Sequence, residues 1–176
     1  MNFPETSPNL ILVVDDEINI RELIKEFLEE EGNFQIITAS NGREALELFQ
    51  KHSREIAIIM SDIKMPLMDG LELLRELRAI EPEAVVVMIS ALTDIQSAIN
   101  AMDRGAYSYI TKPFKVSELL IMVRRAVEKR KLLLENKMYQ KHLEELVAER
   151  TLEVRKAYQE LDKTYHSTLT ALVNAL

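Results

Sequence analysis

The first two thirds of the chain alternate short apolar runs with stretches of helical spacing, five times over. Three of the runs, at residues 9–14, 56–60 and 84–89, are apolar almost throughout. Such runs predict strands that are buried on both faces, as in a parallel sheet with helices on each side. The repeated order of strand and helix therefore predicts an α/β fold with right-handed crossovers.

Polar side chains follow four of these runs at the point where each run ends. They are Asp15 and Asp16 after the first run, Asp62 after the third, Ser90 after the fourth and Lys112 after the fifth. An open parallel sheet binds its ligand beyond the carboxyl ends of its strands, so these residues are expected to form one site. Carboxylates suit a divalent cation, while a hydroxyl and an ammonium group suit a phosphoryl group.

Composition excludes several other classes of protein. The chain has 176 residues and no cysteine, so it has neither a disulfide nor a thiolate metal site. No apolar run approaches the roughly 20 residues that span a bilayer, and the first residues lack the order of a signal peptide, which fits a cytoplasmic protein. Residues 129–176 hold nine Lys/Arg and seven Asp/Glu, a charge of +2, which leaves −9 on the rest. This balance predicts no direct nucleic-acid binding by the segment.

From about residue 117 to the end the chain contains neither glycine nor proline, which predicts one helix of about 60 residues, ~90 Å long. Its seam steps mostly by three and four, the spacing of a coiled coil. The seam is Leu132, Asn136, Tyr139, Leu143, Val147, Thr151, Val154, Tyr158, Leu161, Tyr165, Leu169, Leu172 and Leu176. Repeated steps of four near 139–147 and 161–169 predict local unwinding of the supercoil. We expect a parallel homodimer; a helix folded back on the domain is the alternative.

Five motifs in order along residues 8–128 resemble the receiver domain of two-component response regulators. They are Asp15-Asp16, Asp62, Met65-Pro66 with Gly70, Ser90-Ala91 and Lys112-Pro113-Phe114. The resemblance implies a flavodoxin-like fold with strand order 2-1-3-4-5. We expect the chain to consist of a receiver domain, 8–128, and a coiled-coil helix, 129–176, that continues the fifth helix and would lead to a missing output domain.

The resemblance also implies a chemistry for the site. Asp62 would accept a phosphoryl group from a cognate histidine kinase. Mg²⁺ would be bound directly by Asp16, Asp62 and the backbone carbonyl of Lys64, with Asp15 acting mostly through water. Lys112 would place its ammonium group on a phosphoryl oxygen, and its peptide bond to Pro113 would be cis.

Two further positions would form the switch of such a domain. Ser90 would donate its hydroxyl to a phosphoryl oxygen, and Tyr109 would fill the space that Ser90 vacates. The apolar Leu92 beside the site would hinder water, which predicts a phosphorylated state that lasts longer than minutes. Glu17 is interpreted as a residue favoured by the dipole of the first helix rather than as a metal ligand.

The output is less determined by the sequence. Residues 165–176 resemble the lead-in helix of HD-GYP phosphodiesterases, which hydrolyse cyclic di-GMP, although a histidine-kinase helix or a diguanylate cyclase could follow instead. The segment itself is not expected to be an enzyme. A stand-alone adaptor that acts by protein binding is an alternative. A phosphatase that forms an aspartyl-phosphate is disfavoured, because Lys64 stands where a second acid would be needed.

Overall fold

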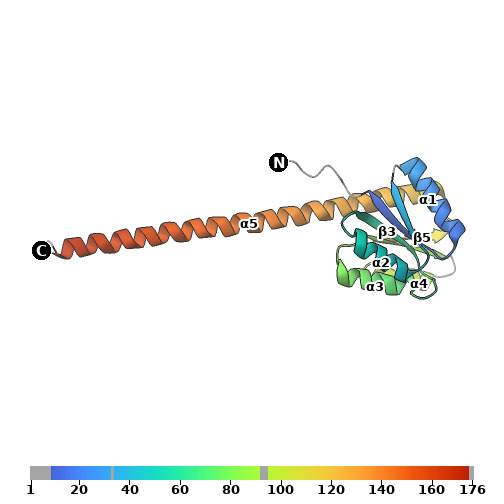
Figure 1. Cartoon of the computed structure of the whole chain (residues 1–176), viewed down its shortest axis with the longest axis horizontal. Coiled ribbons are helices and arrows are strands. Elements are labelled where there is room, and N and C mark those ends of the chain that lie inside the picture. Colours follow the sequence, from blue (N-terminus) through green and yellow to red (C-terminus); the bar gives the residue numbers. More distant parts are fainter. Residues whose placement is uncertain (1–8, 33, 92–94, 175–176) are drawn as a thin grey trace. The chain divides into compact units, whose positions relative to one another are not determined.

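Strands and helices alternate along the chain, as the apolar runs predict. The computed structural model describes residues 9–32, 34–91 and 95–174, and within them five strands alternate with five helices (Figure 1). The elements are β1 (Leu10–Val14), α1 (Ile18–Gly32), β2 (Gln35–Ala39), α2 (Gly42–His52), β3 (Ile56–Asp62), α3 (Gly70–Ile80), β4 (Val86–Ala91), α4 (Ile95–Asp103), β5 (Ser108–Lys112) and α5 (Val116–Asn174). None of the described helices is long and apolar enough to cross a membrane.

The five strands form one parallel sheet in the order β2-β1-β3-β4-β5. This order confirms the predicted flavodoxin-like topology. It also puts β1 next to β3, where Val14 pairs with Ser61. The residues that follow this pair, Asp15 and Asp62, are thereby brought to neighbouring positions at the carboxyl edge of the sheet.

Each face of the sheet carries its own hydrophobic core. Leu12 and Val14 of β1 point to the core that includes Leu73 and Leu77 of α3, while Ile11 and Val13 point to the core that includes Leu28 of α1. Figure 1 shows α2 and α3 together on one side of the sheet. Burial of each such side chain contributes roughly 1.5–3 kcal/mol, so the two cores hold the strand ends in place.

The loop between β3 and α3 is fixed by close backbone approaches. The Gly70 N–H donates to the Ile63 carbonyl at 2.9 Å, and a Cβ atom on Gly70 would lie 2.1 Å from the Asp62 carbonyl oxygen. Only glycine fits there. Asp69 caps α3 by accepting from the Glu72 N–H at 2.8 Å. The start of α3 is therefore held directly against the end of β3, beside Asp62.

The chain divides into two compact units, one up to Leu133 and one from Leu134. In the first unit, Leu119, Val123 and Ala126 of α5 are buried in the core that also contains α1. In the second unit, from Asn136 to Ala171, the described residues are all exposed. The prediction of one unbroken helix from about residue 117 is confirmed, whereas the pairing of that helix and the boundary at 128/129 stay predictions.

Candidate functional site at the carboxyl edge of the sheet

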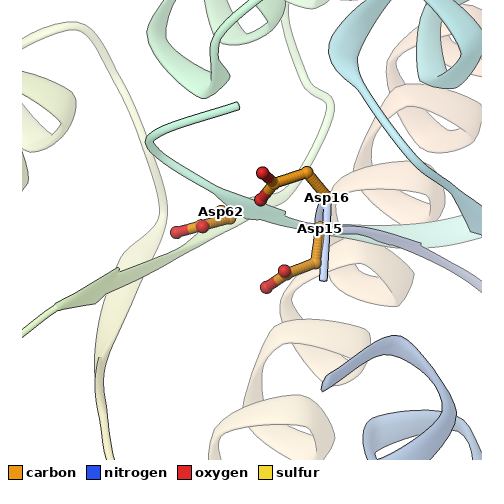
Figure 2. A group of neighbouring side chains, drawn as sticks. All are labelled: Asp15, Asp16 and Asp62. Atoms are coloured by element: carbon orange, nitrogen blue, oxygen red, sulfur yellow. The ribbon is translucent and has the colours of Figure 1, made fainter. Parts of the chain in front are cut away.

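Three carboxylates meet where β1 and β3 end. Asp15 and Asp16 directly follow β1, and Asp62 is the last residue of β3 (Figure 2). One carboxylate oxygen from each of the three lies within 4.8 Å of the others. Asp15 is fully buried and Asp62 is 9% exposed, while Asp16 is open to solvent. The cluster thus has a buried floor and one accessible side.

Lys112, the last residue of β5, points into this cluster. Its Nζ atom lies 2.7 Å from Asp15 Oδ2 and 3.3 Å from Asp62 Oδ2. The Glu17 carboxylate is 3.9 Å from the same atom, but its side chain is 66% exposed. The peptide bond between Lys112 and Pro113 is cis, as predicted. The amine and the three aspartates, far apart in sequence, therefore form one charged group.

Backbone hydrogen bonds orient the two buried carboxylates. Asp15 Oδ1 accepts from the Glu17 N–H at 2.9 Å, and Asp62 Oδ1 accepts from the Ile63 N–H at 2.8 Å. One oxygen of each group is thus held by the backbone, which leaves the other oxygen facing Lys112. The Arg21 guanidinium of α1 also donates to the Asp15 carbonyl. No motif or spacing in the sequence marks Arg21 as part of the site.

The surroundings shift the pKa values of two of these groups. The pKa of Asp62 is raised, first because burial disfavours its charged form and then because Asp15 repels it, and attraction to Lys112 does not overcome these effects. Burial alone would lower the pKa of Lys112, but its contacts with Asp15 and Asp62 outweigh burial and raise it. Three carboxylates thus share one ammonium group, and the repulsion between Asp15 and Asp62 would be relieved by a bound cation.

The donor set fits Mg²⁺. All three candidate ligands are carboxylates, and Mg²⁺ is usually held by one or two carboxylates together with several waters. A cavity of about 410 Å³ adjoins Asp16 and leaves room for such waters; it is lined by Asp16, Ile63, Lys64, Met65, Pro66, Asp69, Leu71 and Ser97. The aspartate cluster could thus hold a metal ion, whereas a ligand role for the Lys64 carbonyl stays a prediction.

The two residues of the predicted switch lie on the neighbouring strands. Ile89 of β4 pairs with Asp62, so Ser90 is the next residue along; it is 1% exposed, and its Oγ donates to the Ala91 carbonyl at 3.2 Å. Tyr109 of β5 pairs with Met88 and is 45% exposed. Leu92, on which the predicted lifetime rests, lies outside the described residues. The roles of these positions remain predictions.

Comparison with known families agrees with this geometry. A model of the response regulator receiver domain matches residues 11–124. The chain therefore belongs to the response regulator receiver family of two-component systems, whose domains are regulatory modules that accept a phosphoryl group.

Particular relatives show how far the likeness extends. The chain is 37% identical over 123 residues to the regulatory protein AtoC of Escherichia coli strain K12. The matched segment covers 70% of this chain and 26% of AtoC. It thus spans about a quarter of that protein. The crystal structure of a receiver domain protein from Clostridium thermocellum matches with 37% identity and a TM-score of 0.67, over 70% of this chain and 98% of that one. The receiver domain of NtrX from Brucella abortus matches with 41% identity and a TM-score of 0.63, over 67% and 98%.

Proposed function

We propose that Asp62 accepts a phosphoryl group from a cognate histidine kinase and that the chain is the receiver part of a response regulator. The observation that carries this proposal is the position of Lys112 Nζ, 3.3 Å from Asp62 and 2.7 Å from Asp15, at the floor of an acidic cluster. A carboxylate can act as a nucleophile and hold the group as an aspartyl-phosphate. An Asp62 oxygen bonds to phosphorus as the bond from phosphorus to the donor's imidazole nitrogen breaks, and the imidazole keeps that electron pair and takes up a proton.

The other residues of the cluster balance charge and set geometry. Asp15, Asp16, Asp62 and the Lys64 carbonyl would hold Mg²⁺, which when bound neutralises the charge on the phosphoryl oxygens. The Lys112 ammonium group, already directed at Asp62, contacts one phosphoryl oxygen as a point charge. Because the backbone holds the Oδ1 atoms of Asp15 and Asp62, these side chains need little rearrangement during transfer.

Ser90 and Tyr109 would convert the new charge into a change of surface. Ser90 sits one residue beyond the partner of Asp62, so its hydroxyl can turn to donate to a phosphoryl oxygen. Tyr109, which is half exposed, can then move inward. Phosphorylation shifts the balance between the two arrangements only through such differential contacts.

The output would pass through a homodimeric coiled coil. The support is the row of large apolar side chains that the second unit exposes, among them Val147, Tyr158 and Leu161. A parallel pair of such helices would carry the change to an output domain, with an HD-GYP phosphodiesterase acting on cyclic di-GMP as one candidate. The match covers 26% of AtoC, so that relative has further sequence outside the matched segment.

The test is labelling by acetyl phosphate with and without Mg²⁺. Wild type should gain one hydroxylamine-sensitive phosphoryl group only with Mg²⁺, and Asp62→Asn should gain none. Asp103→Asn, which removes an exposed carboxylate at the end of α4, is the matched control and should label like wild type. Equal labelling of Asp62→Asn, or none of wild type, would contradict the proposal.

A further inference from the structure

An arginine interrupts the buried stripe of α5. Leu119, Val123 and Ala126 face the core at helical spacing, and the next position in the stripe is Arg130, which is only 4% exposed. Among the described residues it is the one basic side chain that is buried. An apolar residue would pack at this position without desolvating a charge, so hydrophobic packing alone does not explain an arginine here.

The partners of Arg130 lie in the turn between α3 and β4. Its guanidinium donates to the Glu83 carbonyl at 3.1 Å and lies 3.9 Å from Glu81 Oε1. The turn is itself ordered, because the Glu81 N–H donates to the Leu77 carbonyl and the Ala84 N–H donates to the Glu81 carbonyl at 3.0 Å. Arg130 therefore binds a defined turn rather than a loose side chain.

This turn is connected at both ends to the candidate site. Helix α3, which enters the turn, begins at Gly70 against the end of β3. Strand β4, which leaves the turn, carries Ser90 at its other end. Helix α5 starts at Val116, shortly after Lys112. Arg130 thus links α5 to the turn between α3 and β4 at the opposite edge of the sheet. Each of these three elements begins or ends near the site.

We propose that Arg130 is a positioning residue that fixes the rotation of α5 about its own axis and so couples the site to the helix that continues to Asn174. Apolar contacts have no direction and tolerate small rotations, whereas hydrogen bonds from a guanidinium to a carbonyl weaken steeply with misalignment. A displacement of this turn would therefore be transmitted to α5 through the hydrogen bond from Arg130 to the Glu83 carbonyl. The coupling to phosphorylation rests on the proposed function, but the fixing of α5 does not.

The experiment uses the full chain and three variants. Arg130→Met removes the donors but keeps an apolar side chain of similar length, and such replacements of buried charges often leave a fold intact. Arg124→Met is the matched control, because Arg124 is exposed on the same helix and loses the same charge. Arg130→Lys keeps a donor and tests rescue. Because the chain has no cysteine, single cysteines at Tyr139, Leu143 and Leu161 report cross-links between helices.

Three readouts separate coupling from folding. Labelling by acetyl phosphate should be unchanged in all variants. Hydrogen exchange at the α5 amides of residues 126–134, measured without phosphate, should rise about tenfold in Arg130→Met. The change in cross-linking that phosphorylation causes in wild type should vanish in Arg130→Met, persist in Arg124→Met and return in part in Arg130→Lys.

The outcomes are distinguishable. The inference is overturned if the α5 amides of Arg130→Met exchange at the wild-type rate. It is also overturned if the cross-linking pattern of Arg130→Met still changes on phosphorylation. A loss of labelling in Arg130→Met also overturns it, because that would make Arg130 a general structural residue. If Arg130→Met does not fold, the same two measurements on Arg130→Leu, which also removes the donors, decide instead. A failure of wild type to label counts against the proposed function instead, and the exchange measurement then still decides whether Arg130 fixes α5.

Discussion

The two units of the chain use the same apolar residue types in opposite ways. In the unit that ends at Leu133, Leu73 and Leu74 are completely buried between helix and sheet. In the unit from Leu134, Leu161 is 65% exposed and Tyr158 is 74% exposed. The difference is not one of composition but of whether the residue has a packing surface within its own unit.

This contrast means that the two units depend on different variables. The first unit has a closed core on each face of its sheet, so its stability is intrinsic to the chain. The second unit is a helix whose described ion pairs are exposed, such as Arg150 with Glu153 at 2.7 Å, and pairs of that kind contribute less than about 1 kcal/mol. In the homodimer that we propose, its apolar seam would gain free energy from contact with the second helix, so its stability would depend on protein concentration.

The sharpest test of the contrast is the same substitution made in each unit. Leu74→Ala should lower the free energy of unfolding of the first unit by about 2–5 kcal/mol, because it leaves a cavity in a closed core. Leu161→Ala should change that free energy by less than about 0.5 kcal/mol, since it lies in the other unit. Urea unfolding followed by the amide signals of β3 measures both. Equal losses would show that the units do not unfold independently.

A second test uses the metal, which should act on the first unit alone. Mg²⁺ at a hundred times its dissociation constant should stabilise the first unit by about 2.7 kcal/mol, provided that only the folded state binds it. Asp16→Asn should reduce this gain, and because Asp16 is exposed the change should leave the core intact. Asp103→Asn is the control. Thermal unfolding with and without Mg²⁺ is the measurement, and a gain that survives in Asp16→Asn would argue against the predicted ligand set.

The position of the site could be predicted from sequence because it depends on a regular rule. Asp15 directly follows β1 and Asp62 ends β3, and the order of the strands makes them neighbours. Arg130 could not be recognised in the same way. It is a charged residue on a long polar helix, and its burial depends on a turn 47 residues earlier in the chain. The clue was its spacing from Ala126, which continues the buried stripe.

The loop after Asp62 shows a second limit. It contains both a proline and a glycine, but the left-handed residue is Leu67, with φ of 68°, and not Gly70. Gly70 is instead required where α3 meets the backbone of Asp62. Which residue of a loop takes the positive φ depends on such tertiary contacts, and sequence propensity alone assigns it to the glycine.

The exposed seam predicts a self-association that one charge can disrupt. Leu161→Asp should raise the dissociation constant of the dimer by at least about tenfold, because it places a charge where apolar side chains would meet. Gln159→Asp adds a charge at an exposed position outside the seam and should have a much smaller effect. Sedimentation equilibrium measures both constants. If wild type is monomeric at high micromolar concentration, the seam has another partner than a second copy.

The strained residue of the first unit offers a smaller gain. Leu67→Gly should stabilise the first unit by about 0.5 kcal/mol. It relieves the strain of a left-handed non-glycine residue, roughly 1–2 kcal/mol, but it also adds conformational entropy to the unfolded chain, which offsets part of this gain. Leu67 is 80% exposed, so little packing is lost. Leu67→Ala keeps the Cβ atom and hence the strain, and it should not stabilise. Urea midpoints of the three proteins decide this, and equal gains for Ala and Gly would point to removal of the exposed side chain instead.

A weak dependence of stability on pH is also expected in the first unit. The Ser40 hydroxyl and N–H both donate to Glu44 Oε2 at 2.7 Å, and these two bonds, the side-chain bond first, lower the pKa of Glu44. A carboxylate with a lowered folded pKa adds stability above its unfolded pKa, and this stability is lost as pH falls through the folded pKa. The difference in unfolding free energy between wild type and Glu44→Gln should therefore be constant near neutral pH and shrink in acid. This difference should stay below about 1 kcal/mol, because Glu44 is exposed to solvent. Glu47→Gln, an exposed position on the same helix, is the control. A difference that grows in acid would mean that the neutral form of Glu44, and not its carboxylate, is the better partner for Ser40.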